Sequence, residues 1–225
     1  MSVGLPEPEF IDNPENRCPV ILLLDTSGSM SGKPIMELNR GVRIFKASVM
    51  EDRLASLRVE VAVITFNSQV EVIQDFVTID NFTPKELTTS GTTHMGEGIN
   101  QALDLLEERK TQYRENDISY YRPWLFLITD GSPTEPTSTW QNAGTRVRAA
   151  EAKNKLLFFA VGVEDADLDI LKEIAPVARP PQKLKSLDFQ SMFEWLGASV
   201  KQVSVGKIGE KKEPPPTDGW AEVII

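Results

Sequence analysis

The 225-residue sequence contains one cysteine, one histidine and no apolar run long enough to cross a bilayer. A single cysteine cannot form an internal disulfide, which fits a protein of a reducing compartment. We expect Cys18 to be a small buried residue at the start of a strand. Residues 1–16 have neither the basic start nor the apolar centre of a secretory signal. These features predict a cytoplasmic protein.

Positive charge is also scarce. The chain has 24 Lys and Arg against 33 Asp and Glu, which gives a net charge of −9 and a pI near 4.8. This balance argues against binding to nucleic acids or anionic membranes, although a local basic patch is compatible with it. With 40% apolar and 25% charged residues, the composition suits one globular α/β domain.

The most informative stretch of the sequence is the wholly apolar run 20–24. It ends at Asp25 and is followed by hydroxyl residues at Ser27 and Ser29. A continuous aliphatic run is typical of a central parallel strand, and open α/β sheets bind ligands beyond the carboxyl ends of such strands. Gly28 allows a tight turn there. The carboxylate and hydroxyls are hard donors that suit magnesium or manganese. A helix N-cap and turn is the alternative interpretation of the pattern.

Strands and helices alternate along the rest of the sequence. Apolar spacings of three and four predict helices, and apolar β-branched runs predict strands. The predicted helices cover 35–49, 99–106, 143–153, 168–174 and 189–203, and the further strands cover 57–66, 70–77, 124–128 and 156–163.

This order predicts a doubly wound α/β fold: a six-stranded, mostly parallel sheet with helices on both faces and an antiparallel edge strand at 70–77. Three loops then meet at the carboxyl edge of the sheet, namely 25–32, 90–98 and 130–136. The predicted organisation is an N-terminal extension (1–16), one domain (17–205) and a C-terminal tail (206–225).

The second and third loops also carry oxygen donors. The second contains Thr92 and Thr93, which would cap the following helix if the loop stood alone. The third begins with Thr129-Asp130-Gly131 at a strand end. His94 is a poor ligand for magnesium and is expected to contact a partner or solvent.

Together, Asp25-x-Ser27-x-Ser29, the Gly-x-Thr93 loop and Thr129-Asp130-Gly131 resemble the metal-ion-dependent adhesion site (MIDAS) of von Willebrand factor type A domains. The resemblance covers about residues 17–203. It implies that Ser27, Ser29 and Thr93 bind Mg²⁺ or Mn²⁺ through hydroxyls, and that Asp25 and Asp130 act directly or through water. Thr92 remains a rival to Thr93, because relatives often have glycine before the threonine.

Two segments of the sequence are similar to the bacterial TerY-like branch of these domains, which is linked to tellurite and chemical-stress resistance. They are Leu-Leu-Leu-Asp-Thr-Ser-Gly-Ser-Met and Leu-Ile-Thr-Asp-Gly-Ser-Pro-Thr. The resemblance implies a non-enzymatic binding module in which a partner protein's Asp or Glu completes the metal shell. It also suggests a phosphorylation-linked stress complex with a kinase and a phosphatase as partners.

An enzyme is the competing class. A magnesium-dependent phosphoryl-transfer or hydrolytic protein could use Asp25 as nucleophile, but it needs an acid or base two residues on, where this chain has Ser27. A dinucleotide-binding fold has the same architecture, yet neither its glycine fingerprint nor a Gly-Lys-Ser phosphate loop occurs.

The tail has an apolar end. Pro214-Pro215-Pro216 is followed by the mostly apolar segment 220–225. We expect this segment to dock, either as a strand on a sheet edge or in a partner's groove, because burying its large side chains offsets the cost of ordering it. The alternative is a disordered tail.

Overall fold

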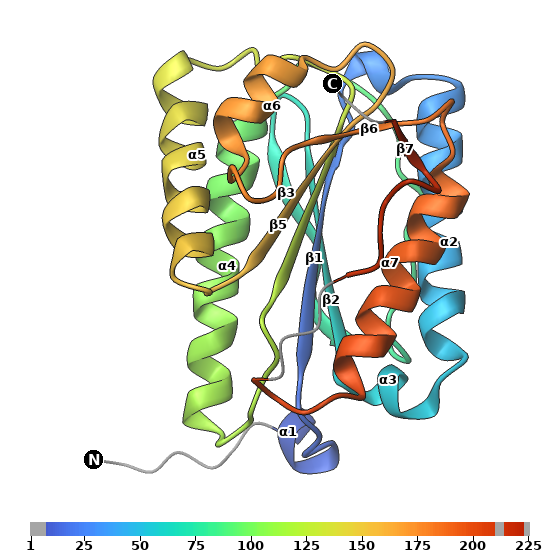
Figure 1. Cartoon of the computed structure of the whole chain (residues 1–225), viewed down its shortest axis with the longest axis vertical. Helices are drawn as coiled ribbons and strands as arrows, with labels where there is room; N and C mark the ends of the chain where they lie inside the picture. Colours follow the sequence, from blue (N-terminus) through green and yellow to red (C-terminus); the bar gives the residue numbers. More distant parts are fainter. Residues whose placement is uncertain (1–7, 210–213, 223–225) are drawn as a thin grey trace.

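A computed structural model describes residues 8–209 and 214–222. Its centre is a seven-stranded sheet in the order β3-β2-β1-β4-β5-β6-β7. Helices α4, α5 and α6 cover one face of the sheet, and α2, α3 and α7 cover the other (Figure 1). The strands are β1 (Cys18–Asp25), β2 (Val59–Phe66), β3 (Val70–Thr78), β4 (Trp124–Thr129), β5 (Leu157–Gly162), β6 (Gln182–Leu184) and β7 (Ala221–Glu222). The helices are α1 (Pro8–Asp12), the 3₁₀ turn η1 (Gly28–Met30), α2 (Lys33–Met50), α3 (Arg53–Arg58), α4 (Met95–Glu115), α5 (Thr137–Ala152), α6 (Leu168–Ile174) and α7 (Phe189–Ser204).

The predicted fold class is confirmed. Strand β1 lies in the middle and pairs in parallel with β2 and β4, so that Val20 faces Val61 on one side and Trp124 on the other. Strand β3 returns antiparallel to β2 as the expected hairpin. The carboxyl ends of β1, β2, β4 and β5 therefore share one edge of the sheet.

The sheet has one strand more than predicted. Strand β7 pairs antiparallel with the short β6, Leu184 lying opposite Ala221. These strands have three and two residues, which is too short to show an apolar period in the sequence. The start of the apolar tail thus docks on the sheet edge, and Trp220 is 1% exposed. The rest of that segment, 223–225, lies outside the described residues.

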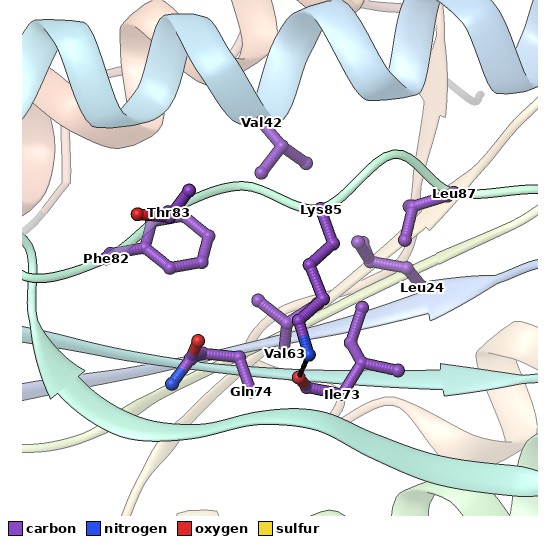
Figure 2. A pocket seen from close by; sticks show the side chains of 9 residues that line it. All are labelled: Leu24, Val42, Val63, Ile73, Gln74, Phe82, Thr83, Lys85 and Leu87. Carbon is purple, nitrogen blue, oxygen red and sulfur yellow. Dashed lines mark hydrogen bonds between the residues drawn. The ribbon is translucent and has the colours of Figure 1, made fainter.

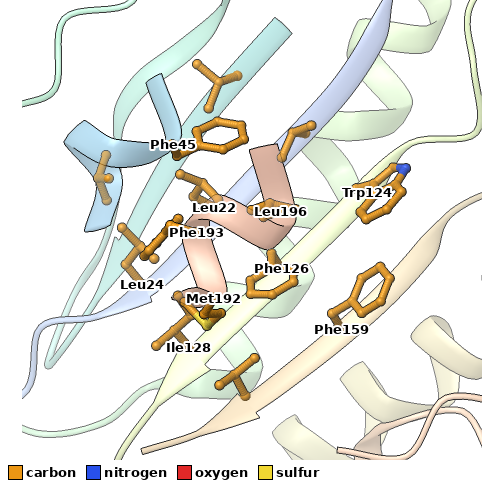
Figure 3. Packing of buried hydrophobic residues seen from close by; sticks show 14 of the residues in the cluster. Leu22, Leu24, Phe45, Trp124, Phe126, Ile128, Phe159, Met192, Phe193 and Leu196 are labelled. Carbon is orange, nitrogen blue, oxygen red and sulfur yellow. The ribbon is translucent and has the colours of Figure 1, made fainter. Parts of the chain in front are cut away.

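Both faces of the sheet are buried. Along β1, Leu22 and Leu24 belong to the apolar cluster under α2 and α7, whereas Ile21 and Leu23 belong to the cluster under α4 and α5. Figure 3 shows the first cluster, in which Phe193 of α7 lies among these side chains. This two-sided burial explains why the strand reads as a continuous aliphatic run.

The segment between β3 and α4 is anchored on its way to the second candidate loop. Asn39 of α2 accepts a hydrogen bond from the Leu87 amide (2.8 Å) and donates one to the Leu87 carbonyl (2.9 Å). Lys85 Nζ donates to the carbonyl of Ile73 in β3 at 2.6 Å, as the dashed line in Figure 2 shows. These contacts set the path of the chain towards Ser90.

The described part of the N-terminal extension packs on the domain. Phe10 of α1 is 3% exposed, and Glu9 forms an ion pair with Arg109 of α4 at 2.6 Å. Arg109 and Arg17 both bind the buried Glu60 of β2. Across residues 8–209 and 214–222, no helix combines the length and apolar composition that a bilayer span requires. The domain limits at 17 and 205 remain predictions.

Candidate metal site

The three predicted loops meet at the carboxyl edge of the sheet. Asp25 is the last residue of β1, and Asp130 directly follows the neighbouring parallel strand β4. The second loop is held against the first, because Gly28 N–H donates to the Gly91 carbonyl at 3.1 Å and Ser90 N–H donates to the Thr26 carbonyl at 2.9 Å. Residues more than 60 positions apart in the chain thus form one site.

Asp25 is fully buried and held at both oxygens. Its Oδ1 accepts the Ser27 amide at 2.8 Å, and its Oδ2 accepts the Thr129 hydroxyl at 2.5 Å. The first bond is the turn that the Asp-x-Ser spacing permits. The second comes from the last residue of β4 and depends on strand register. Thr129 is therefore a positioning residue for Asp25.

Two serines join the carboxylates of the first and third loops. The Ser27 and Ser29 hydroxyl oxygens lie 3.0 Å apart, and Ser29 Oγ donates to Asp130 Oδ1 at 2.7 Å. The hydroxyls and the Asp130 carboxylate thus form a continuous polar chain. All four predicted residues from these two loops are brought together.

The structure distinguishes Thr93 from its rival Thr92. Thr93 is 5% exposed, and its hydroxyl borders Gly131, where an added Cβ would lie 3.2 Å from Thr93 Oγ1 and 3.8 Å from Ser29 Oγ. Thr92 is exposed and turns the other way, with its hydroxyl 2.9 Å from that of Ser68. Of the two, Thr93 has its hydroxyl next to Gly131, on the same side as Ser29.

Sequence reasoning missed the residues that hold Thr93 in place. Thr134 Oγ1 accepts the Thr93 amide at 3.0 Å, and the Thr134 amide donates to the Thr93 carbonyl at 2.9 Å. Next to it, Glu135 accepts the amides of Gly96 and Glu97 and so caps α4. Nothing in the spacing within loop 130–136 could have indicated these contacts.

His94 lies outside the cluster of oxygen donors. It occupies the N-cap position of α4, where its side chain makes no capping hydrogen bond. Its Nδ1 instead lies 3.1 Å from Glu97 Oε2, and both side chains are partly exposed. This position agrees with the expectation of a loop residue that contacts solvent or a partner.

The two carboxylates carry negative charge that no basic side chain of the described residues balances. Burial raises the pKa of Asp25 to about 6, although its hydrogen bonds to Ser27 and Thr129 oppose the increase. Burial also raises the pKa of Asp130. Within the described chain, no Lys, Arg or His forms an ion pair with either residue. Buried carboxylates in this state favour a bound cation.

The donor set fits a hard divalent cation. It contains two carboxylates and three hydroxyls. Clusters of three or more His, Cys, Asp or Glu side chains with metal-binding geometry are absent from the described residues. An all-oxygen set with few charges suits Mg²⁺ or Mn²⁺ better than a softer ion.

These features define a class of protein: a doubly wound α/β domain with an oxygen-donor site of acids and hydroxyls at the carboxyl edge of its sheet. Residues 20–194 match the family model of the von Willebrand factor type A domain, and the chain belongs to this family. The comparison with curated protein sequences gives no match.

Solved structures share the fold at low sequence identity. The pilus adhesin SpaC from Lactobacillus rhamnosus GG is 14% identical, with a TM-score of 0.68 over 83% of this chain and 30% of that chain. The PilB minor pilin from Streptococcus sanguinis is 14% identical, with a TM-score of 0.58 over 84% of this chain and 62% of that one. Proximal thread matrix protein 1 from the mussel byssus, in a structure with a zinc-occupied MIDAS motif, is 17% identical, with a TM-score of 0.54 over 84% and 46%. This chain thus spans less than two thirds of each neighbour.

Proposed function

We propose that this chain is a protein-binding module whose binding depends on a divalent metal. Ser27, Ser29 and Thr93 would hold Mg²⁺ or Mn²⁺ through their hydroxyls, and Asp25 and Asp130 would act directly or through water. The observation that carries the proposal is the pair of buried carboxylates, joined by hydroxyls and without a basic partner in the described residues. The family and its adhesin neighbours support a binding role.

A bound metal ion would have a coordination position that an oxygen of a partner protein can fill. Mg²⁺ in proteins usually keeps several waters, and a carboxylate can replace one of them. The protein donors include only two acids, so a bound divalent ion retains affinity for a further anionic oxygen. An Asp or Glu of a partner protein is the matching group.

A groove next to the site could accommodate the rest of the partner segment. It has a volume of about 470 Å³ and runs from Thr26 and Ser90 towards the β2–β3 hairpin and Lys85. Its lining includes Asn67, Ser68 and Gln69 of the hairpin loop. Polar walls with hydrogen-bonding side chains suit a peptide segment better than an apolar ligand.

Binding is favoured over phosphoryl transfer by the state of Asp25. A nucleophilic carboxylate needs an oxygen that can approach a substrate, whereas Asp25 is fully buried and uses both oxygens in hydrogen bonds. Release of phosphate from p-nitrophenyl phosphate in the presence of magnesium, lost on Asp25→Asn substitution, would establish the enzyme instead.

Calorimetric titration with MgCl₂ and MnCl₂ tests the metal. We expect binding to the wild type and a loss of about tenfold or more in Ser29→Ala, since that hydroxyl bonds Asp130. Ser31→Ala is the matched control, because Ser31 is an exposed serine in the same loop. Equal affinities in the two variants would refute the site.

We propose that the partner belongs to a phosphorylation-linked stress complex in the cytoplasm, because the sequences of the first and third loops are similar to the TerY-like branch. A kinase or phosphatase should be captured from native cytosol by the wild type with magnesium, and released by EDTA. Capture that is equal with the Ser29→Ala variant would contradict the metal-dependent mode.

A further inference from the structure

Glu135 is a buried acid of the third loop that is not among the proposed metal ligands. It lies two positions before α5 and is 8% exposed. Its two side-chain oxygens accept hydrogen bonds from the Gly96 and Glu97 amides, the second at 3.0 Å. Both amides belong to the first turn of α4, 39 and 38 residues away in the sequence. This acid thus caps a helix other than the one it precedes.

A close contact between α4 and α5 makes this arrangement possible. A Cβ added at Gly96 would lie 2.5 Å from Trp140 Cα and 2.7 Å from Glu135 Oε1, so glycine is required there. The first turn of α4 therefore lies directly against the start of α5, on the face of the sheet that both helices cover (Figure 1). The Glu135 carboxylate is enclosed at the end of α4.

The same loop also fixes the nearest proposed ligand. Thr134, the residue before Glu135, accepts the Thr93 amide at 3.0 Å and donates its own amide to the Thr93 carbonyl at 2.9 Å. Gly96 is three residues after Thr93, so their Cα atoms lie at most about 11 Å apart. The charge of Glu135 is therefore close to the proposed metal site, although its oxygens bond to helix amides and not to a proposed ligand.

The end of α4 would otherwise oppose a bound cation. The aligned peptide dipoles of a helix place about half a positive charge at its N-terminus, and α4 is 21 residues long. This end begins at Met95, two residues after Thr93, and would repel a metal ion held by that loop. His94 occupies the N-cap position but makes no capping hydrogen bond. Glu135 instead supplies a full negative charge at this place, which exceeds the charge of the helix end.

The hydrogen bonds favour the ionised form of Glu135. Both of its oxygens accept, as in an ionised carboxylate, whereas a protonated carboxyl group carries a donor. Burial raises the pKa of Glu135, but the bonds from Gly96 and Glu97 oppose the increase. Among the described residues, no Lys, Arg or His forms an ion pair with it. Its charge is therefore opposed mainly by the end of α4.

We propose that Glu135 is a positioning residue of the metal site, which raises the affinity for a divalent cation by offsetting the positive end of α4. The inference rests on the proposed metal-dependent function. Across about 10 Å, at an effective dielectric constant of about 20, one unit charge changes the affinity for a divalent ion by about tenfold or more. A cap that only stabilised the helix would leave the metal affinity unchanged.

Calorimetric titration of the full chain with MgCl₂ near pH 7 tests the proposal. Glu135→Gln removes the charge but keeps the size of the side chain, and should weaken magnesium binding by about tenfold. Glu135→Asp keeps the charge at the helix end and should bind magnesium within about threefold of the wild type. The matched control is Glu97→Gln, which removes a 52% exposed carboxylate from the same helix turn and should change the affinity by less than about twofold.

Urea denaturation in EDTA separates the charge from the structural role of the cap. Asparagine-sized or amide side chains at position 135 cannot reproduce both capping bonds, so Glu135→Asp and Glu135→Gln should each lower the urea midpoint of the metal-free protein. Only Glu135→Gln should also lose magnesium affinity. Its deficit relative to the wild type should shrink with added NaCl, because salt screens the interaction between charges.

Three patterns among the variants would overturn the proposal. Equal magnesium affinities of the wild type and Glu135→Gln would remove Glu135 from the site. Equal losses in Glu135→Gln and Glu97→Gln would leave only the net charge of the protein as the cause. A loss in Glu135→Asp as large as that in Glu135→Gln would assign the effect to the geometry of the cap. Failure of the proposed function is distinguishable from all three, because a folded wild type would then bind no magnesium.

Discussion

Replacing Asp25 by Asn should stabilise the metal-free protein at neutral pH while it abolishes stabilisation by metal. Burial raises the pKa of Asp25 to about 6, whereas an aspartate in the unfolded chain titrates near 3.9. The folded state therefore holds this proton more tightly than the unfolded state. Stability is lost as the pH rises from about 4 to 6, and the loss is nearly complete at pH 7.

The magnitude follows from the difference between the two pKa values. A change of one unit in a pKa corresponds to about 1.4 kcal/mol. The pKa of Asp25 is about two units higher in the folded state, which lowers the free energy of unfolding by about 3 kcal/mol at pH 7. Asparagine carries no charge and keeps an oxygen for the Ser27 amide, while the Thr129 hydroxyl can rotate to accept from its nitrogen. We expect Asp25→Asn to gain up to about 3 kcal/mol at pH 7 and almost nothing at pH 4.

Urea denaturation in EDTA at several pH values measures this difference. The control is Asp169→Asn, whose side chain is 92% exposed, and its stability should change by less than about 0.5 kcal/mol. In 10 mM MgCl₂ the wild type should gain stability by mass action, whereas Asp25→Asn should not. An asparagine variant that is less stable than the wild type in EDTA at pH 7 would refute the desolvation argument. Equal stabilisation of both proteins by magnesium would refute the site.

Three further predictions concern single side chains. Thr93→Val should weaken magnesium binding by about tenfold in calorimetry, with an unchanged far-UV spectrum, whereas Thr92→Val should not; the reverse result would exchange their roles. Trp220→Ala should lower the free energy of unfolding by about 3–5 kcal/mol in urea titrations, because the Trp220 side chain is buried at the sheet edge with 1% of its surface exposed. An unchanged free energy of unfolding would mean that the tail does not dock on its own domain. Gly41→Ala should destabilise by about 1–3 kcal/mol, since a Cβ there would overlap the Phe193 ring, and Phe193→Leu should restore much of the loss; a more stable Gly41→Ala would show that helix propensity outweighs the overlap.

The sequence was sufficient for the elements that carry a strong local pattern. The aliphatic run 20–24 predicted a strand buried on both faces, and the spacing of apolar residues over 35–49 predicted α2. Such patterns depend on residues that are neighbours in the chain, so they are visible without a fold. The spacing of Asp25, Ser27 and Ser29 similarly indicated one loop of oxygen donors.

Tertiary structure decided which distant residues meet. The bond from Thr129 to Asp25, the orientation of Thr93 rather than Thr92, and the support from Thr134 all depend on the register of β1 and β4 and on loop packing. The strands β6 and β7 are too short to show a period, and they form because Trp220 is buried beside them.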